Sequence, residues 1–247
     1  MKRRVILSGL VLLLLWALLS YSGVVDSFFL PTPLEVGEKF VELISSGRLF
    51  VDIGGTFGRA ILSLKISAII GVPVGLLIGL STGLREWLEV PIEFFRSLPS
   101  PAIFPLLMVF LGIDEKSKIA GTVFACVFPI IVQTAYGVIN GNRWRVKLVR
   151  RMGFSRRRML FKVVIPEALP YIFVGLRNAL SLSLISTMVV EMLMTGNIGV
   201  GYSIFDAYQR FRISEMYAYI LTAGLLGWMV NKLFVYFENR QLHWVRQ

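Results

Sequence analysis

Long apolar runs dominate this chain, and most of them are long enough to cross a lipid bilayer as an α-helix. About 20 apolar residues span the hydrocarbon core of a membrane, because a helix rises about 1.5 Å per residue. Lipid offers no partner to backbone polar groups, which leaves helices and closed barrels as the spanning structures. The sequence therefore predicts an all-α integral membrane protein with six transmembrane helices, near residues 5–19, 57–80, 88–112, 118–140, 171–194 and 213–237.

Composition excludes a soluble domain. Hydrophobic residues make up 55% of the chain and charged residues only 17%, whereas soluble proteins average about 25% charged residues. A soluble domain with so much apolar surface would expose large patches and aggregate. In a bilayer, acyl chains solvate the same surface.

Basic residues indicate which side of the membrane faces the cytoplasm. If the N-terminus is cytoplasmic, the inside collects Lys2, Arg3, Arg4 and the basic run at 143–162, while most acidic residues fall outside. The net charge of +11 is therefore a topology signal, and we expect no nucleic-acid partner. The first run also fits a signal peptide, but the later spans favour a retained helix. We expect a multi-pass inner (cytoplasmic) membrane protein with both termini in the cytoplasm.

Three parts follow from the order of the runs. Residues 1–53 hold the first span and an external segment, whose apolar spacing from Leu34 to Ile44 predicts a short amphipathic helix. Residues 54–238 form the membrane core, and residues 239–247 form a cytoplasmic tail. Prolines punctuate the core, and those at 99 and 101 are expected to bend an interfacial helix into the third span.

Small residues recur every four positions along the second span. Side chains of this size let two helix backbones approach closely, which is how helices associate in lipid. One interpretation is ordinary packing inside one chain, and the other is a dimer or pore-lining face. The stripe consists of Ser63, Ser67, Gly71, Gly75 and Gly79.

Four charged residues are candidates for buried or pathway positions: Arg59, Lys65, Arg177 and Glu191. A charge near mid-bilayer is costly and usually faces protein or water. Arg59 and Arg177, like Arg96 and Lys232, could also extend from a helix end to the membrane surface. For Glu191 a structural ion pair and a place on the translocation path both stay open, and Lys65 lies deeper.

Enzyme chemistry has little support in this sequence. Cys126 is the only cysteine and His243 the only histidine. No disulfide framework, metal site or His-based active site is expected, and we predict no catalytic residues and no cofactor. The chain also lacks the G-x-x-x-x-G-K-[ST] phosphate loop of an ATPase.

The connection at residues 141–170 is too long for a turn and has helical composition. Leu148, Met152 and Phe161 give it apolar faces among many Arg and Lys residues. Apolar side chains outside the bilayer indicate docking to a soluble partner. The alternative is a basic amphipathic helix on anionic lipid headgroups.

The spacing of Gly153, Val163, Ile165 and Pro166 in this connection resembles the cytoplasmic "EAA" loop of ABC importer permeases. The family form is Glu-Ala-Ala, three residues, Gly, nine residues, then Ile-x-Leu-Pro, and the first three positions are Lys147, Leu148 and Val149 here. Further matches to the branch that imports nitrate, taurine and other sulfonates, and pyrimidine-type precursors lie at 29–36, around Pro99, and at 169–177, 191–193 and 199–202.

The resemblance implies the type I permease (MetI-like) fold and a role as the permease subunit of an ATP-driven importer. Its implied partners are two ABC ATPase subunits, a second permease copy forming a homodimer, the lipid bilayer, and a periplasmic or lipid-anchored solute-binding protein. A Gly at 153 suits two short helices that meet at a sharp angle. The implied ATPase-coupling residues are Lys147, Leu148, Val149, Met152, Gly153, Phe154, Ile165 and Pro166.

Two alternatives belong to other functional classes. A secondary transporter would need carboxylates near the midplane and usually an internal repeat, and Glu191 is the one candidate. A membrane-embedded enzyme would need clustered His, Asp or Ser groups, and the sequence offers no such cluster.

Overall fold

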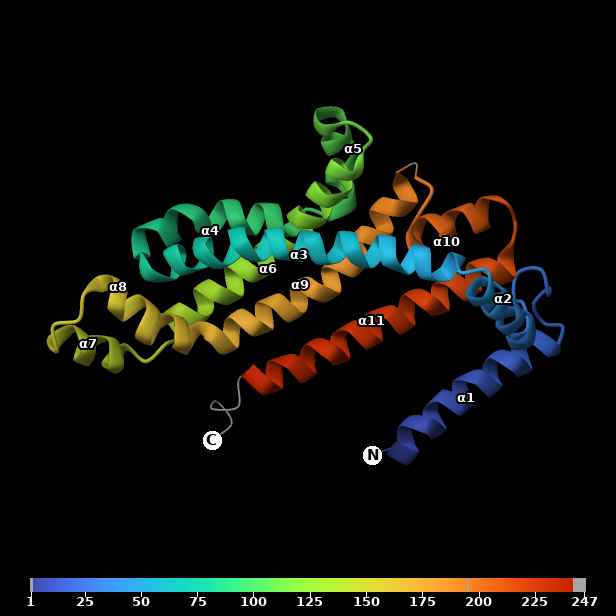
Figure 1. The fold of residues 1–247 in the computed structure, drawn as a ribbon, viewed down its shortest axis with the longest axis horizontal. Coiled ribbons are helices and arrows are strands. Elements are labelled where there is room, and N and C mark those ends of the chain that lie inside the picture. The colour runs from blue at the N-terminus through green and yellow to red at the C-terminus, as the bar shows by residue number, and fades with distance from the viewer. Residues whose placement is uncertain (1, 195, 242–247) are drawn as a thin grey trace. The chain divides into compact units, whose positions relative to one another are not determined.

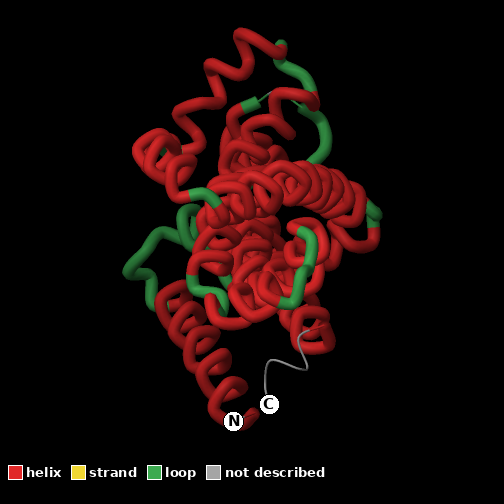
Figure 2. The backbone as a smooth tube through the Cα atoms, turned by 90° about the vertical axis from the view of Figure 1, so that its left-hand side faces the viewer, coloured by secondary structure: helices red, strands yellow, loops and turns green. Residues whose placement is uncertain are grey.

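The computed structural model describes residues 2–194 and 196–241. Figure 2 shows that this part of the chain consists of helices and loops without a strand, which confirms the prediction of an all-α protein. The elements, labelled in Figure 1, are α1 (Lys2–Tyr21), α2 (Pro33–Ser45), α3 (Arg48–Leu80), α4 (Thr82–Ser97), α5 (Ser100–Leu111), α6 (Glu115–Ile139), α7 (Arg143–Arg151), α8 (Arg156–Met159), the π-helix η1 (Leu160–Val164), α9 (Ile165–Leu193), α10 (Val200–Gln209) and α11 (Ile213–Gln241).

Most of the predicted spans correspond to helices of suitable length and composition. Four such helices are α3, α6, α11 and the continuous run Arg156–Leu193, which joins α8, η1 and α9. The α4 and α5 helices pass the same test as a pair, although they are bent by 95° at their junction. The described apolar part of α1, Leu7–Tyr21, is shorter. Four predicted spans are thus confirmed, a fifth corresponds to the bent pair, and the first stays a prediction.

The described residues fall into two compact units. The first takes in the residues up to Thr56 together with 191–226, and the second takes in 57–190 and the described residues from 227 onward. Because the boundaries fall inside α3, α9 and α11, each of these helices contributes to both units. The domain limits expected after residues 53 and 238 stay a prediction, and residues 242–247 of the expected tail, with His243, lie outside the described residues.

In the first unit, the loop before α2 is fastened to α1 and α11. The Trp16 indole donates to the Pro31 carbonyl at 3.1 Å, and its ring stacks on that of Tyr217. Thr32 and Glu35 form a capping box at the start of α2, where Pro33 occupies the first turn. Val36 and Leu43 are the buried side chains of α2. The short amphipathic helix expected in this segment is therefore present.

In the second unit, α3, α6 and α9 pack around a shared core. Cys126 and Ile130 of α6 contact Ala179 of α9, with Leu64 and Val72 of α3 beside them. Toward the C-terminal end of α6, a second apolar cluster consists of Ile78, Ile131 and Ala135. Leu88 and Ile92 of α4 pack against it.

The small-residue stripe of α3 lies against α6 of the same chain. A Cβ built on Gly75 would lie 2.6 Å from the Ile131 carbonyl oxygen, and one on Gly79 would lie 3.0 Å from that of Ala135. Gly71 is equally tight against Ile130. Ser67 donates its hydroxyl to the carbonyl of Ser63 at 2.8 Å and to that of Val123 at 3.3 Å. The stripe thus brings the two backbones together along most of α6.

The bend between α4 and α5 lies where the sequence places two prolines close together. Leu98 and Pro99 have extended backbone conformations between the two helices. Pro99 has no N–H to continue α4, and a proline disfavours helical geometry in the residue before it. The bend expected from prolines 99 and 101 is present, with α4 as the helix that precedes it.

Candidate functional site

The connection at 141–170 contains a well-capped helix that ends in a glycine turn. The Asn142 side chain accepts hydrogen bonds from the first backbone N–H groups of α7. At the other end Gly153 has φ +78°, a conformation that side chains with a Cβ rarely adopt. The Phe154 N–H then donates back to the Val149 carbonyl, and Ser155 caps α8. This is the glycine turn that the loop motif predicts.

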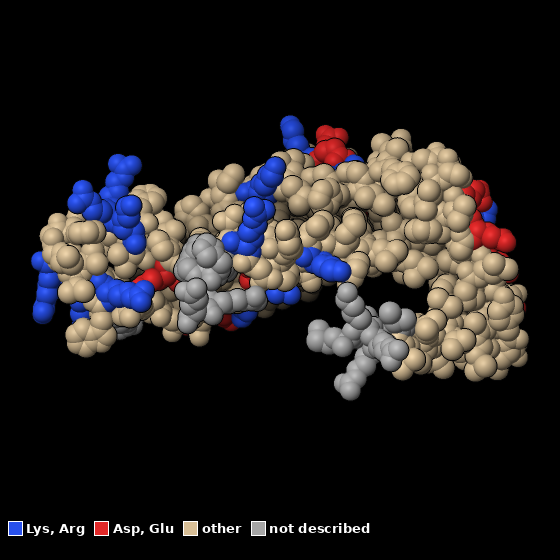
Figure 3. All heavy atoms as spheres, turned by 60° about the horizontal axis from the view of Figure 1, so that its bottom comes forward, with Lys and Arg blue, Asp and Glu red and all other residues tan. Residues whose placement is uncertain are grey.

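Apolar side chains of this segment are exposed in the described structure. Trp144 is 78% exposed, Met152 67% and Leu148 60%. We call these three residues, together with the exposed Phe161, the docking surface, after the role that the sequence predicts for this connection. Lys147 is also exposed, and its ammonium lies 5.2 Å from the centre of the Trp144 ring, a cation–π contact. Figure 3 shows Lys and Arg gathered at the end of the second unit where α7 and α8 lie.

The remaining expected coupling residues differ in exposure. Val149, Phe154 and Ile165 are half-buried, while Gly153 and Pro166 are exposed. The Phe154 ring lies under the guanidinium of Arg158, at 5.4 Å.

Glu167 fixes α7 to the start of α9, and sequence reasoning missed it. Its carboxylate accepts from the Asn142 N–H at 2.8 Å and pairs with Arg145 at 3.3 Å. The position of Gly141 leaves room for this carboxylate, since a Cβ there would lie 3.1 Å from its oxygen. The sequence feature that could have identified Glu167 is an acidic residue within a segment rich in Lys and Arg.

The second half of the connection is continuous with the next predicted spanning helix, which was not expected from the sequence. Instead of a short helix that ends before Pro170, the chain runs as one helix from Arg156 to Leu193. The turn at Leu160–Val164 is a π-helix that ends two residues before Pro166. A proline ring clashes with the carbonyl four residues earlier in an α-helix, and a wider turn relieves that clash.

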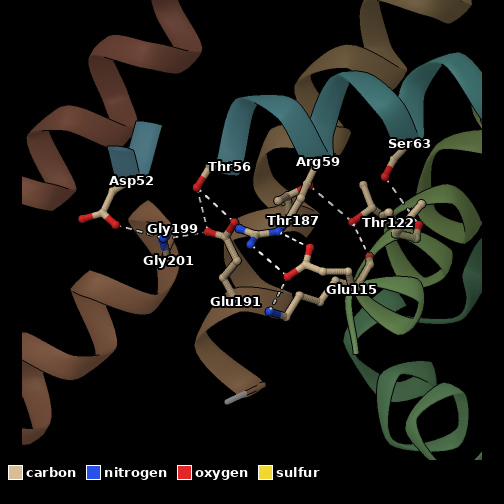
Figure 4. Close-up of polar contacts among 12 residues, drawn as sticks. Asp52, Thr56, Arg59, Ser63, Glu115, Thr122, Thr187, Glu191, Gly199 and Gly201 are labelled. Atoms are coloured by element: carbon tan, nitrogen blue, oxygen red, sulfur yellow. Dashed lines mark hydrogen bonds and ion pairs between the residues drawn. The ribbon is translucent and has the colours of Figure 1, made fainter. Parts of the chain in front are cut away.

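Glu191 belongs to the last turn of α9, and its buried side chain, 1% exposed, contacts the N-terminus of α10 within the first unit. Its carboxylate accepts from the Thr56 hydroxyl, at 3.0 and 2.8 Å to its two oxygens, and from the Gly201 N–H at 3.0 Å (Figure 4). The Thr56 oxygen itself accepts from the Val200 N–H at 2.9 Å. A carboxylate is favoured here because the first N–H groups of a helix lack intrahelical partners.

Asp52 caps the same helix from one turn earlier in α3. It accepts from the Gly199 N–H at 3.0 Å, from the Ser203 hydroxyl at 2.8 Å and from the Tyr219 hydroxyl at 2.7 Å. Asp52, Ser203 and Tyr219 are all buried. Sequence reasoning missed these partners, although Asp52 and Thr56 form a polar pair one turn apart near the start of a spanning helix.

Arg59 pairs with Glu115 within the second unit (Figure 4). Its Nε and Nη2 donate to the two carboxylate oxygens at 2.6 and 2.9 Å, a bidentate geometry. Lys118 contacts the same carboxylate at 3.0 Å. The pair links α3 to the first turn of α6.

The other two charged candidates lie apart from these clusters. Arg177 donates from Nε to the Asn231 amide oxygen at 3.3 Å, which ties α9 to α11. Lys65 is exposed on α3, beside the exposed Leu62 and Ile69. Among the described residues no group of three or more His, Cys, Asp or Glu could hold a metal ion.

The family described as "Binding-protein-dependent transport system inner membrane component" matches residues 71–246 of this chain. The chain belongs to this family. The protein is therefore the permease subunit of an ABC importer, a transport subunit and not an enzyme. Membership of this family gives no support to the alternative that the permease is a secondary transporter.

Curated relatives cover nearly the whole permease. It is 30% identical to the putative aliphatic sulfonates transport permease protein SsuC of Bacillus subtilis, over 95% of this chain and 84% of that protein. It is 32% identical to the bicarbonate transport system permease protein CmpB of Synechococcus elongatus, over 92% of this chain and 84% of that protein. The sulfonate relative agrees with the branch that the sequence motifs resemble.

Solved structures confirm the fold. A chain of the MetNI methionine ABC transporter in an inward-facing conformation superposes with a TM-score of 0.70 at 18% identity. The match covers 78% of the permease and 95% of that chain. The expected MetI-like fold is therefore correct.

Proposed function

We propose that the permease imports a small anion, of the sulfonate, nitrate or bicarbonate type, delivered from outside by a solute-binding protein. Two relatives that span more than nine-tenths of this chain are named for an aliphatic sulfonate and for bicarbonate, and both solutes are anions. The motif resemblance to the nitrate, taurine and sulfonate branch supports the same class. The pyrimidine-precursor alternative has no counterpart in these two names.

Partner ATPase subunits supply the energy, and the docking surface transmits it. The observation that carries this proposal is the exposure of Trp144, Leu148 and Met152 on a helix outside the predicted spans. Glu167 holds that helix against the start of α9, so force on α7 reaches a spanning helix through short polar contacts. The sequence has no phosphate loop of its own, so hydrolysis takes place in the partner.

The assembly is a permease homodimer on two ATPase subunits, with the solute-binding protein on the opposite side of the membrane. Both permease termini and the docking surface face the cytoplasm. The basic run around α7 and α8 supports this orientation through the positive-inside rule.

Substitution of Gly153 tests the docking surface. A β-branched residue disfavours φ +78°, so Gly153→Val distorts the turn between α7 and α8. Asn adopts positive φ more readily, and Gly153→Asn is the matched control. Open space surrounds a Cβ at this position, so the effect is conformational and not a clash. The expected result is that Gly153→Val reaches the membrane but loses its ATPase on co-purification, while Gly153→Asn keeps most of it.

The lipid-surface alternative predicts the reverse ranking. If the segment lies on headgroups, Gly153→Val retains the ATPase and transport, while replacement of Arg156, Arg157 and Arg158 by Gln weakens function more. That ranking would refute the coupling role of the docking surface.

A further inference from the structure

A cavity of about 200 Å³ lies at the break between α4 and α5. Its walls include Phe95, Arg96, Leu98 and Ser100 around the break, and Phe124 and Phe128 of α6. The Phe95 ring stacks on Phe128 at 6.2 Å and meets Phe124 edge-on at 6.3 Å. These two α6 residues flank the middle of a 25-residue spanning helix, so the cavity lies near mid-membrane depth.

The charged face of α4 leads from one end of α6 to this cavity. Arg85, Glu89 and Glu93 line a second hollow against α6, which extends from Ile131 to Ile139. Glu89, Glu93 and Arg96 are exposed in the described structure. Charged groups at membrane depth face protein or water because exposure to acyl chains is costly. This face of α4 therefore borders an aqueous path, and Arg96 is its innermost charge.

The polar groups around the cavity are hydrogen-bond donors. A guanidinium has five N–H donors, and Arg96 uses Nη2 toward the Glu93 carboxylate at 3.0 Å. Within the described part of the chain its other nitrogens and the Ser100 hydroxyl have no partner. A fork of cationic donors beside a hydroxyl is an arrangement that recognises an oxyanion, whether planar like nitrate and bicarbonate or tetrahedral like a sulfonate.

We propose that the transported anion pauses in this cavity, bound by the Arg96 guanidinium and the Ser100 hydroxyl between the phenylalanine rings. The inference rests on the proposed import of an anion and assigns that anion a site within the permease. Glu93 holds Arg96 when the cavity is empty, so an entering anion competes with that carboxylate. Release toward the α4 face restores the Arg96–Glu93 pair.

The test uses the complete importer with its ATPase and binding protein in proteoliposomes, with isotopically labelled bicarbonate, nitrate and methanesulfonate as probes. Arg96→Gln is expected to lower uptake at least tenfold, while ATPase retention and binding-protein-stimulated hydrolysis stay within twofold. Ser100→Ala is expected to raise the KM for uptake several-fold. Ser97→Ala is the matched control, because the Ser97 hydroxyl donates to the Phe94 carbonyl of its own helix.

A binding measurement separates a site from a merely structural role. In detergent without binding protein, methanesulfonate should raise the melting temperature of the wild-type importer above that in sodium chloride of equal ionic strength. Glu93→Gln should enlarge this shift because it removes the competing carboxylate, and Arg96→Gln should abolish it.

Three results would overturn this site, and a fourth concerns the proposed function. Wild-type uptake by Arg96→Gln, or by Ser100→Ala with an unchanged KM, removes the site but leaves an anion importer in place. A methanesulfonate shift that survives in Arg96→Gln also removes it. If the wild-type importer takes up none of the three probes, the anion class itself is wrong, and the site falls with it.

Discussion

Thr56 and Glu191 lie 135 positions apart in the sequence, yet the Thr56 hydroxyl lies within 3.0 Å of both carboxylate oxygens of Glu191. Both side chains are buried, and together they satisfy the N–H groups of Val200 and Gly201 at the start of α10. The arrangement gives Glu191 a structural task that accounts for a carboxylate in an apolar helix. These hydrogen bonds join the start of α3, the end of α9 and the start of α10 within the first unit.

Glu191→Gln is expected to destabilise the permease. The Thr56 hydroxyl and the Gly201 N–H donate to the same carboxylate oxygen, which an amide oxygen can replace. The NH2 group that replaces the other oxygen is a donor facing the Thr56 hydroxyl, and the negative charge at the start of α10 is lost. The loss should amount to about 1–3 kcal/mol, the cost of leaving a buried polar group unsatisfied. Thermal unfolding of the purified importer measures it. Glu38→Gln, at an exposed position of α2, is the control and should unfold as wild type does.

Gly75→Ala is expected to weaken packing between α3 and α6. The added methyl group would meet the Ile131 carbonyl oxygen at 2.6 Å, and backbone cannot move aside as a side chain can. Overpacking of this kind costs about 1–3 kcal/mol. Gly58→Ala on the same helix is the matched control, because open space surrounds a Cβ there. If both variants melt at the same temperature, the tight α3–α6 approach is incorrect.

Glu167→Gln is expected to uncouple hydrolysis from transport. The amide loses the charge that pairs with Arg145, so α7 is held less firmly against α9. The ATPase should still co-purify, because the docking surface is untouched, while solute transported per ATP falls several-fold. Uptake and hydrolysis measured on one proteoliposome preparation give that ratio. Glu38→Gln serves again as the control, and an unchanged ratio in Glu167→Gln would argue against transmission through this carboxylate.

Reporter fusions test the proposed orientation. A periplasm-active reporter fused after Asp114 or Asp206 should be active, and one fused after Gly153 should be inactive. The physical reason is the excess of Lys and Arg around α7 and α8, which are retained on the cytoplasmic side. Inverted signals at all three positions would mean that the docking surface faces outward and cannot meet an ATPase.

The features that depend on glycine, namely the close approach of α3 to α6 and the turn at Gly153, were predictable from the sequence. A glycine every four residues on α3 indicates close helix approach, and Gly71, Gly75 and Gly79 do lie against α6. Gly153 has positive φ, as the loop motif predicts. Each feature depends on residues near one another in sequence, so its pattern is visible without the fold.

The partners of the buried acids could not be predicted in this way. Asp52 meets Gly199 and Tyr219, which lie 147 and 167 positions away. Only the folding of α10 and α11 against the start of α3 brings these groups together, and no local periodicity encodes that contact. The π-turn before Pro166 was missed for a different reason, since a proline can end, bend or widen a helix and its sequence alone does not decide among these.

The wide turn at Leu160–Val164 works as a one-residue insertion in the helix that joins the basic segment to the membrane. Each residue of an α-helix turns the chain by about 100°, given 3.6 residues per turn. A π-turn absorbs the extra residue within one turn, so the helix keeps the same faces before and after it. Deleting one residue from this turn would therefore restore regular α-helix and leave Trp144 and its neighbours pointing as before. A deletion in the regular part of α9 would instead swing them around the helix axis by more than a quarter circle. The wide turn is thus a place where the length of this helix can change by one residue without changing the direction of the surface.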